Sequence, residues 1–119
     1  FSMTENSLAV CVEERIPVVV VILNNRSLGM VEQWQRLFYS SRYSAVKRGG
    51  SPDFVKLAEA YGAVGIRAAS IDEFEKALNY GLISEVATVI DVPISSEEDV
   101  YPFVPPGASL KEMMLGPSG

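Results

Sequence analysis

The sequence contains no histidine and a single cysteine, Cys11, and these scarcities exclude several kinds of active site. Without histidine, the 119 residues cannot form a Ser-His-Asp or a Cys-His catalytic arrangement. One cysteine makes no internal disulfide, and without histidine it makes no zinc site of the Cys/His type. A reducing compartment fits this cysteine content, so we expect a cytoplasmic protein.

Long apolar runs and positive charge are also scarce. The longest aliphatic run, Val18–Leu23, is far shorter than the roughly 20 residues that span a bilayer, so we expect no membrane segment. Ten basic against 15 acidic side chains give a formal net charge of -5, which argues against nucleic acid or an anionic membrane as a partner. No glycine-rich phosphate loop of the GxGxxG or GxxxxGK[ST] type occurs.

The rest of the composition is that of one globular domain, and helical and strand-like segments alternate along it. The continuous β-branched run Val18–Leu23 predicts a parallel strand covered on both faces by helices. The alternation predicts an α/β fold, a parallel sheet flanked by helices. We expect helices at 5–14, 29–38, 51–61, 70–82 and 110–114, and strands at 18–23, 63–68 and 87–92.

Apolar stripes and caps predict how the helices are oriented. In the helix at 29–38, we expect Met30, Trp34, Leu37 and Phe38 to form one stripe, and a core position of Trp34 on an inward stripe stays open as an alternative. The helix at 51–61 has the predicted inward residues Phe54, Leu57, Ala58 and Tyr61. The helix at 70–82 has the predicted inward residues Phe74, Ala77, Leu78, Gly81 and Leu82. Ser51 is the expected N-cap of the third helix, and Ser70 with Glu73 forms a capping box before the fourth.

Two charged segments are expected to be solvated surface. Residues 39–50 are rich in Ser, Arg, Lys and Gly and indicate a surface loop, with Lys47 and Arg48 in water. The acidic run Glu97-Glu98-Asp99 needs no function and is likewise expected to be exposed.

One strand end carries a dense polar cluster, Asn24-Asn25-Arg26-Ser27. In open parallel sheets, ligands bind beyond the carboxyl ends of the strands. An asparagine carboxamide and exposed backbone carbonyls offer the hard oxygen ligands that Mg2+ prefers, and a helix beginning at Gly29 would direct its amides toward a phosphate. On the residues alone the alternative stays open, because asparagine pairs often satisfy only the backbone of a turn.

Several runs together resemble the catalytic subunits of acetolactate synthase (acetohydroxyacid synthase). The most specific part is Asn24-Asn25 followed by Gly29-Met-Val and Gln33-Trp34. The resemblance spans residues 1–114, with one departure, Ser7 where the family usually has Glu. The other matching runs are Phe38-Tyr39, Arg42-Tyr-Ser44, Pro52-Asp-Phe54, Leu57-Ala58, Tyr61-Gly62, Val100-Tyr-Pro102 and Val104-Pro-Pro-Gly107.

The resemblance implies thiamine diphosphate as the cofactor, held through Mg2+. In this pattern Asn25 gives its side-chain oxygen and Ser27 its backbone carbonyl to the metal, while Asn24 is structural. Met3, Gly29 and Met30 would complete the cofactor-binding residues, and Val31 and Trp34 would line the substrate entrance, with Trp34 shaping acceptor selection. No catalytic residue is expected in this chain, because the cofactor's own aminopyrimidine relays the proton and the activating glutamate belongs to a partner subunit.

The activity implied is decarboxylation of pyruvate and condensation of the two-carbon unit with a second 2-keto acid, such as pyruvate or 2-ketobutyrate, in branched-chain amino acid biosynthesis. FAD would bind the intact parent outside this chain. The resemblance further implies a homo-oligomer with active sites between subunits, and it is compatible with a regulatory subunit.

Residues 1–119 are expected to be the C-terminal portion of a thiamine diphosphate-binding domain. The chain opens inside an apolar pattern, so we expect the Gly-Asp-Gly-Ser motif and the other domains to lie upstream and the isolated fragment to be inactive. Two alternatives stay open: another thiamine diphosphate-dependent 2-keto acid decarboxylase or carboligase, and a non-catalytic α/β module.

Overall fold

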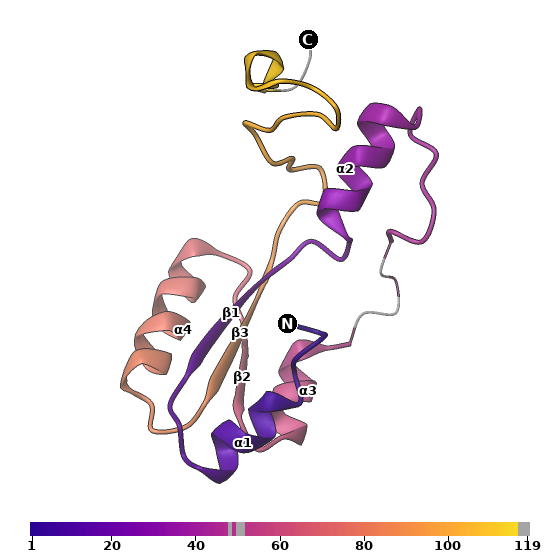
Figure 1. Ribbon diagram of the computed structural model, residues 1–119. Coiled ribbons are helices and arrows are strands. Elements are labelled where there is room, and N and C mark those ends of the chain that lie inside the picture. The colour runs from indigo at the N-terminus through magenta and orange to yellow at the C-terminus, as the bar shows by residue number, and fades with distance from the viewer. Residues whose placement is uncertain (48, 50–51, 117–119) are drawn as a thin grey trace. The chain divides into compact units, whose positions relative to one another are not determined.

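The structure is a computed structural model that describes residues 1–47, 49 and 52–116 (Figure 1). The described chain divides into two compact units. The first comprises Phe1–Arg26 with Arg48–Ile94, and the second Ser27–Lys47 with Ser95–Gly119. Within the described residues, no helix is both long and apolar enough to cross a membrane.

The first unit is built on a parallel sheet, to which the described residues contribute three strands. They are β1 (Val19–Asn24), β2 (Val64–Arg67) and β3 (Thr88–Pro93), in the order β1-β3-β2. Thr88 at the start of β3 pairs with Val19 and Val64, and Asp91 further along pairs with Ile22 and Arg67, so all three strands run in the same direction. The predicted α/β class with a parallel sheet is confirmed.

Helices lie on both faces of this sheet (Figure 1). On one face a buried cluster joins α1 (Ser7–Glu13) and α3 (Phe54–Ala60) to the strands, through Leu8, Ala58 and Val89. On the other face α4 (Ile71–Ile83) packs through Ala77 against Ile90. Val89 and Ile90 serve opposite clusters because successive strand residues point to opposite faces.

The edge strand β1 is less covered than its sequence predicts. Val21 and Leu23 are exposed, Leu23 at 64%, so the prediction that helices cover both faces of the run is wrong for these positions. The reason is that β1 lies at the edge of the sheet and α4 reaches only its beginning, where a Cβ on Gly81 would lie 3.1 Å from Val19. Leu82, predicted to face inward on α4, is also exposed.

The N-caps of α3 and α4 are polar side chains that accept from backbone N–H groups. Asp53 is the N-cap of α3, where its carboxylate accepts hydrogen bonds from the N–H groups of Val55 and Lys56, whereas the predicted cap Ser51 lies outside the described residues. Gly62 ends the same helix with φ of +83°, a conformation that glycine adopts without strain. Ser70 caps α4 by accepting from the Glu73 N–H, as predicted, but the predicted capping box is incomplete, because the Glu73 carboxylate accepts from the N–H of Ala69 and not from that of Ser70.

The second unit contains α2 (Gly29–Phe38) and the short 3-10 helix η1 (Leu110–Glu112). The rings of Phe38 and Phe103 contact edge to face, with centroids 6.2 Å apart. The alternative of an inward stripe on α2 is wrong: Met30, Trp34 and Phe38 are exposed in this unit. The buried residues of the helix are instead polar, Glu32 and Gln33.

We predict that Gly65→Ala destabilises the first unit. A Cβ at this position of β2 would lie 2.5 Å from the carbonyl oxygen of Val55, so backbone would have to move. Overpacking of this kind costs about 1–3 kcal/mol. Hydrogen exchange over residues 54–67 should accelerate, whereas Gly116→Ala, where nothing lies within 4 Å, should have no effect. Equal protection in both variants would contradict this close approach.

Candidate functional site

The carboxyl edge of the sheet is organised by Asn24, the last residue of β1. Its Nδ2 donates to Oδ1 of Asp91 at 2.9 Å, and its Oδ1 accepts from the N–H of Arg26 at 3.1 Å. Its backbone carbonyl accepts from the N–H of Ile94 at 3.1 Å. The prediction that Asn24 is structural, holding the turn through its side chain, is confirmed.

Asp91 is a buried carboxylate on the central strand β3, with 1% of the residue exposed. Besides the bond from Asn24, its Oδ2 accepts from Nη2 of Arg67 at 3.1 Å. Arg67 also contacts Oδ1 of Asp53 at 3.2 Å, nearer the surface. Because an unpaired buried carboxylate is costly, these donors are what allow Asp91 to stay inside the sheet.

Asn25 directly follows β1 and is half-buried. It lies between Asn24, which is anchored by the bonds above, and Arg26, whose φ of 53° is in the left-handed region. Among the residues described, no group of three His, Cys, Asp or Glu side chains could hold a metal ion. The carboxamide oxygen of Asn25 and the backbone carbonyls of the turn are neutral oxygens, the type of donor that suits a hard cation such as Mg2+.

In the second unit, Ser27 and Leu28 are tied to the segment that ends at Lys47. Ser27 forms an isolated antiparallel bridge with Lys47, and the Leu28 N–H donates to the Val46 carbonyl at 3.0 Å. The Ser27 hydroxyl lies 3.3 Å from the same carbonyl. These bonds define the path of the chain into α2.

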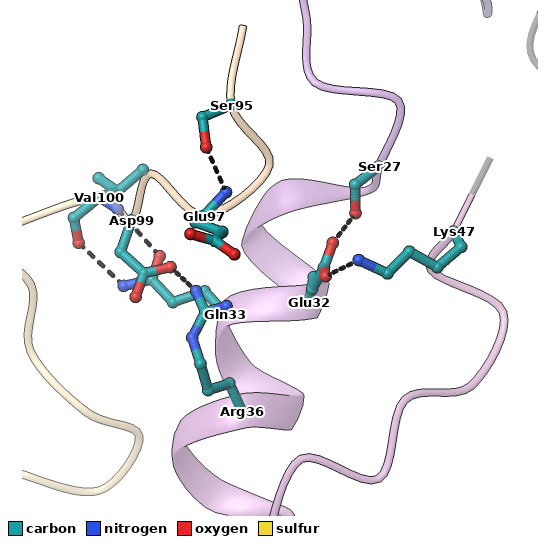
Figure 2. A network of polar contacts seen from close by, with 9 residues as sticks. All are labelled: Ser27, Glu32, Gln33, Arg36, Lys47, Ser95, Glu97, Asp99 and Val100. Atoms are coloured by element: carbon teal, nitrogen blue, oxygen red, sulfur yellow. Dashed lines mark hydrogen bonds and ion pairs between the residues drawn. The ribbon is translucent and has the colours of Figure 1, made fainter. Parts of the chain in front are cut away.

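The carboxylate of Glu32 reaches between Ser27 and Lys47 and accepts hydrogen bonds from both side chains (Figure 2). The hydrogen bond from Lys47, and then that from Ser27, hold the pKa of Glu32 below its usual value although burial opposes this. Glu32 is only 3% exposed, so a charged group is buried next to its cation. Lys47 was predicted to be a solvated loop residue; its side chain is exposed, but its ammonium pairs with this buried carboxylate.

Gln33 and Arg36 hold the segment after residue 95 against the same helix (Figure 2). The Gln33 amide donates to the Val100 carbonyl and accepts from the Val100 N–H, both at 3.1 Å. Arg36 forms an ion pair with Asp99. The prediction that Asp99 is part of a solvated charge run is therefore wrong, because its carboxylate is largely covered in this pair.

The predicted site residues fall in both units. Met3 precedes α1 in the first unit and is 96% exposed, and Asn25 is in the turn after β1. Ser27 and Gly29 belong to the second unit, where Gly29 is the first residue of α2, as predicted. Met30, Val31 and Trp34 follow on the exposed side of that helix, with Trp34 at 40%. Within this unit Trp34 is thus not the core aromatic of the inward stripe.

The polar residues Asp91, Glu32 and Gln33 were not among the predicted site residues. Asp91 carried a usable signal, a charged residue inside a strand that is otherwise apolar. Glu32 and Gln33 carried none, because polar residues on a helix with an apolar stripe ordinarily indicate its solvated face.

A parallel sheet with an amide-bearing turn at its carboxyl edge defines an α/β ligand-binding domain. The family model described as "Thiamine pyrophosphate enzyme, C-terminal TPP binding domain" matches residues 1–92. The chain belongs to this family of thiamine pyrophosphate-binding domains.

Its relatives among curated proteins are acetolactate synthases. It is 45% identical over 96% of its length to the probable acetolactate synthase large subunit of Methanocaldococcus jannaschii, of which it covers 19%. It is 42% identical over 95% of its length to the large subunit of Haemophilus influenzae, covering 20%. The mitochondrial acetolactate synthase of Schizosaccharomyces pombe is 41% identical over 97% of the chain, which covers 17% of it. The chain thus spans about a fifth of the length of the curated relatives it matches.

Solved structures show the same fold. A thiamine diphosphate-dependent 4-hydroxybenzoylformate decarboxylase from Rhodococcus jostii matches 80% of the chain with a TM-score of 0.73 and 28% identity, and 18% of that protein is covered. A benzoylformate decarboxylase from Polynucleobacter necessarius matches 81% with a TM-score of 0.74, again with 18% of the structure covered. At 24% identity, the second likeness concerns the fold alone.

We predict that Lys47→Met loosens the start of α2. It leaves the Glu32 carboxylate buried without its cation, which costs more than losing an exposed ion pair. Hydrogen exchange over residues 27–38 should accelerate by about tenfold, corresponding to about 1–2 kcal/mol. Adding Glu32→Gln, which removes the orphaned charge, should restore part of the protection. If the double variant exchanges faster than Lys47→Met alone, this account of the pair is wrong.

Proposed function

We propose that the chain is the part of an acetolactate synthase catalytic subunit that carries the Asn-Asn end of the thiamine diphosphate motif. The observation that supports this most is the placement of Asn25 in a hydrogen-bonded turn at the carboxyl end of β1. That position is where parallel α/β sheets bind ligands. Identities of 40–45% to acetolactate synthase large subunits over nearly the whole chain support the same assignment.

In the proposed site, Asn25 contributes its side-chain oxygen and Ser27 its backbone carbonyl to a Mg2+ ion. These residues are two positions apart in the chain, and both donors are neutral oxygens that suit this hard cation. Gly29 is the first residue of α2, and the amides at a helix N-terminus favour negative charge, which suits its proposed role as a cofactor-binding residue. Met30 and Met3 would supply apolar contacts to the cofactor. When bound, thiamine diphosphate supplies the electron sink that decarboxylation of a 2-keto acid requires.

The proposed reaction of the whole protein is decarboxylation of pyruvate and transfer of the two-carbon unit to pyruvate or 2-ketobutyrate, a step of branched-chain amino acid biosynthesis. This chain's own residues bind and orient, and the proton-transferring groups belong to the cofactor and to a partner subunit. We extend the proposal to FAD bound outside this chain, to a homo-oligomer with active sites between subunits and to a regulatory subunit as a further partner. The large-subunit names of relatives support a protein with more than one kind of subunit.

The domain and compartment assignments are part of the same proposal. Residues 1–119 form the C-terminal portion of the thiamine diphosphate-binding domain, whose remaining metal ligand would come from a preceding Gly-Asp-Gly-Ser motif. The family match over residues 1–92 supports this reading. We retain the cytoplasm as the proposed compartment, although the Schizosaccharomyces pombe relative is a mitochondrial protein.

Val31 and Trp34 are proposed to line the substrate entrance. Both lie on the exposed side of α2, whereas the buried side of that helix is used by Glu32 and Gln33 for polar contacts. An exposed indole at 40% can contact a substrate without first leaving a core. Its large, rigid surface suits discrimination between acceptors that differ by one methylene.

A second candidate is another thiamine diphosphate-dependent 2-keto acid decarboxylase. The observation that favours it is the 28% identity and TM-score of 0.73 to the 4-hydroxybenzoylformate decarboxylase. Product analysis of the whole protein separates the two: a carboligated 2-hydroxy-3-keto acid identifies the synthase, and a released aldehyde identifies the decarboxylase. Absence of any turnover with a bound cofactor would favour the non-catalytic α/β module.

We predict that Asn25→Ala in the full-length protein weakens Mg2+-dependent binding of thiamine diphosphate by at least about tenfold. The lost carboxamide oxygen leaves the metal one ligand short. Isothermal titration calorimetry at fixed Mg2+ measures the effect. Asn79→Ala is the matched control, because it makes the same chemical change at an exposed position of α4. Unchanged affinity in Asn25→Ala would refute the metal assignment.

We predict that Trp34→Leu changes the choice of acceptor while leaving cofactor binding intact. Loss of indole contacts to one extra methylene should shift the ratio of 2-ketobutyrate to pyruvate products by about tenfold. Competition assays with both acceptors measure this ratio. Tyr80→Leu, at an exposed aromatic of α4, should leave it unchanged. A Trp34→Leu protein with normal selectivity and lowered thermal stability would show a structural role instead.

A further inference from the structure

We propose that Asp91 is a positioning residue that orients the turn carrying Asn25 by acting through the carboxamide of Asn24. The inference rests on the proposed function, because it takes Asn25 to be a metal ligand. It concerns a residue that lies inside the sheet and would touch neither metal nor cofactor.

The position of Asp91 calls for an explanation. It occupies the middle of the central strand, opposite Ile22 of β1 and Arg67 of β2, and is 1% exposed. An apolar residue would be stable there without any partner, whereas a carboxylate requires donors from its surroundings. The donors come from both neighbouring strands: Asn24 of β1 at 2.9 Å and Arg67 of β2 at 3.1 Å.

The hydrogen bond between Asp91 and Asn24 has only one workable direction. An ionised carboxylate accepts and cannot donate, so Asn24 must turn its NH2 group toward Asp91. The carbonyl oxygen of the same amide then faces the opposite way, where it accepts from the N–H of Arg26 at 3.1 Å. The amide orientation thus follows from the charge of Asp91, since a hydrogen-bond network decides which way an asparagine points.

This orientation fixes the turn on both sides of Asn25. Asn24 is held by its side chain and by its backbone carbonyl, which accepts from Ile94, and Arg26 is held by the Asn24 amide. One residue lies between these anchors, so the origin and direction of the Asn25 side chain are set by them. A ligand held in place before the metal arrives binds it more tightly than one that must be ordered on binding.

Asp91→Asn tests this directional logic at nearly constant volume. The new amide offers one accepting oxygen where Asn24 and Arg67 both bring donors. If Asn24 rotates its amide to receive a donor, its NH2 group meets the N–H of Arg26 and the bond that closes the turn is lost. Asn24→Asp fails for a different reason, because it places two carboxylates face to face.

Exchanging the two residues restores the network. In the double variant Asn24→Asp/Asp91→Asn, the amide at position 91 donates to the carboxylate at position 24 and keeps its oxygen for Arg67. The second oxygen of that carboxylate accepts from the Arg26 N–H. Each single variant therefore breaks a hydrogen bond that the double variant restores. If Asp91 only filled space in the sheet, the double variant would not be expected to recover.

The experiment is calorimetric titration of Mg2+ into the full-length protein at a fixed concentration of thiamine diphosphate. We expect Asp91→Asn and Asn24→Asp each to weaken Mg2+ binding by about 10-fold or more, the range typical of residues that support metal ligands. The double variant should return to within about threefold of the unchanged protein, because its bonds match. Activity lost by Asp91→Asn should recover at high Mg2+, whereas a general folding defect would not.

Thr88→Val is the matched control. Thr88 is buried on the same strand, and its hydroxyl donates to the Val86 carbonyl at 3.2 Å at the opposite end from Asn25. It should lower thermal stability and leave Mg2+ affinity unchanged. If Thr88→Val weakens Mg2+ as much as Asp91→Asn does, or if the double variant shows no recovery, the proposal is overturned. Unchanged Mg2+ affinity in Asp91→Asn also overturns it.

If Asp91→Asn does not fold, Asn24→Ala takes its place, because it leaves the pair Asp91–Arg67 intact. Weaker Mg2+ binding by this variant supports the proposal, and unchanged binding overturns it. The comparison with Asn25→Ala separates this inference from the function on which it rests. If Asn25→Ala leaves Mg2+ binding unchanged, the proposed metal site itself is wrong. If Asn25→Ala weakens Mg2+ binding but the variants at Asp91 and Asn24 do not, only the role of Asp91 is wrong.

Discussion

A carboxylate buried in the middle of a parallel sheet is the constraint on which the first unit depends. Asp91 has almost no contact with water, so the sheet must supply donors to it. Asn24 comes from one neighbouring strand and Arg67 from the other, so a single side chain links all three strands near their carboxyl ends. The backbone ladder alone would align the strands, but it would leave the direction of the Asn24 amide undetermined.

The second unit uses buried polar groups in the same way. The covered side of α2 carries Glu32 and Gln33, and each is matched to partners distant in sequence, Lys47 for one and the backbone of Val100 for the other. These contacts specify which segments lie against the helix. Met30, Val31, Trp34 and Phe38 of α2 are left exposed, and in the first unit so are Val21 and Leu23. Exposed apolar residues in such number mark surfaces that proteins use for contacts with other chains or ligands.

The sequence predicted the elements better than their surroundings. The bounds of α2 and the positions of the three strands follow from local patterns of apolar and β-branched residues, which are properties of the chain itself. The prediction of which residues are buried was wrong where burial depends on neighbouring elements. β1 lies at the edge of the sheet, and the buried residues of α2 are polar. Asn24 and Asn25 were found because turn chemistry after a strand is a local signal. Asp91 could not be assigned to them, because the pairing of β1 with β3 joins residues 67 positions apart.

The two asparagines can therefore have different tasks although they are adjacent and chemically identical. Asn24 is the last residue of β1, and both ends of its amide are used, by Asp91 of the neighbouring strand and by the N–H of Arg26. Asn25 lies beyond the ladder, where no strand register dictates its direction, and the turn around it is held from both sides. An amide committed to two protein partners cannot also serve a cation well, so Asn24 is the one of the two that the structure excludes as a ligand. The proposed division of labour thus depends on where the strand stops, because the end of β1 is what commits the Asn24 side chain to the sheet.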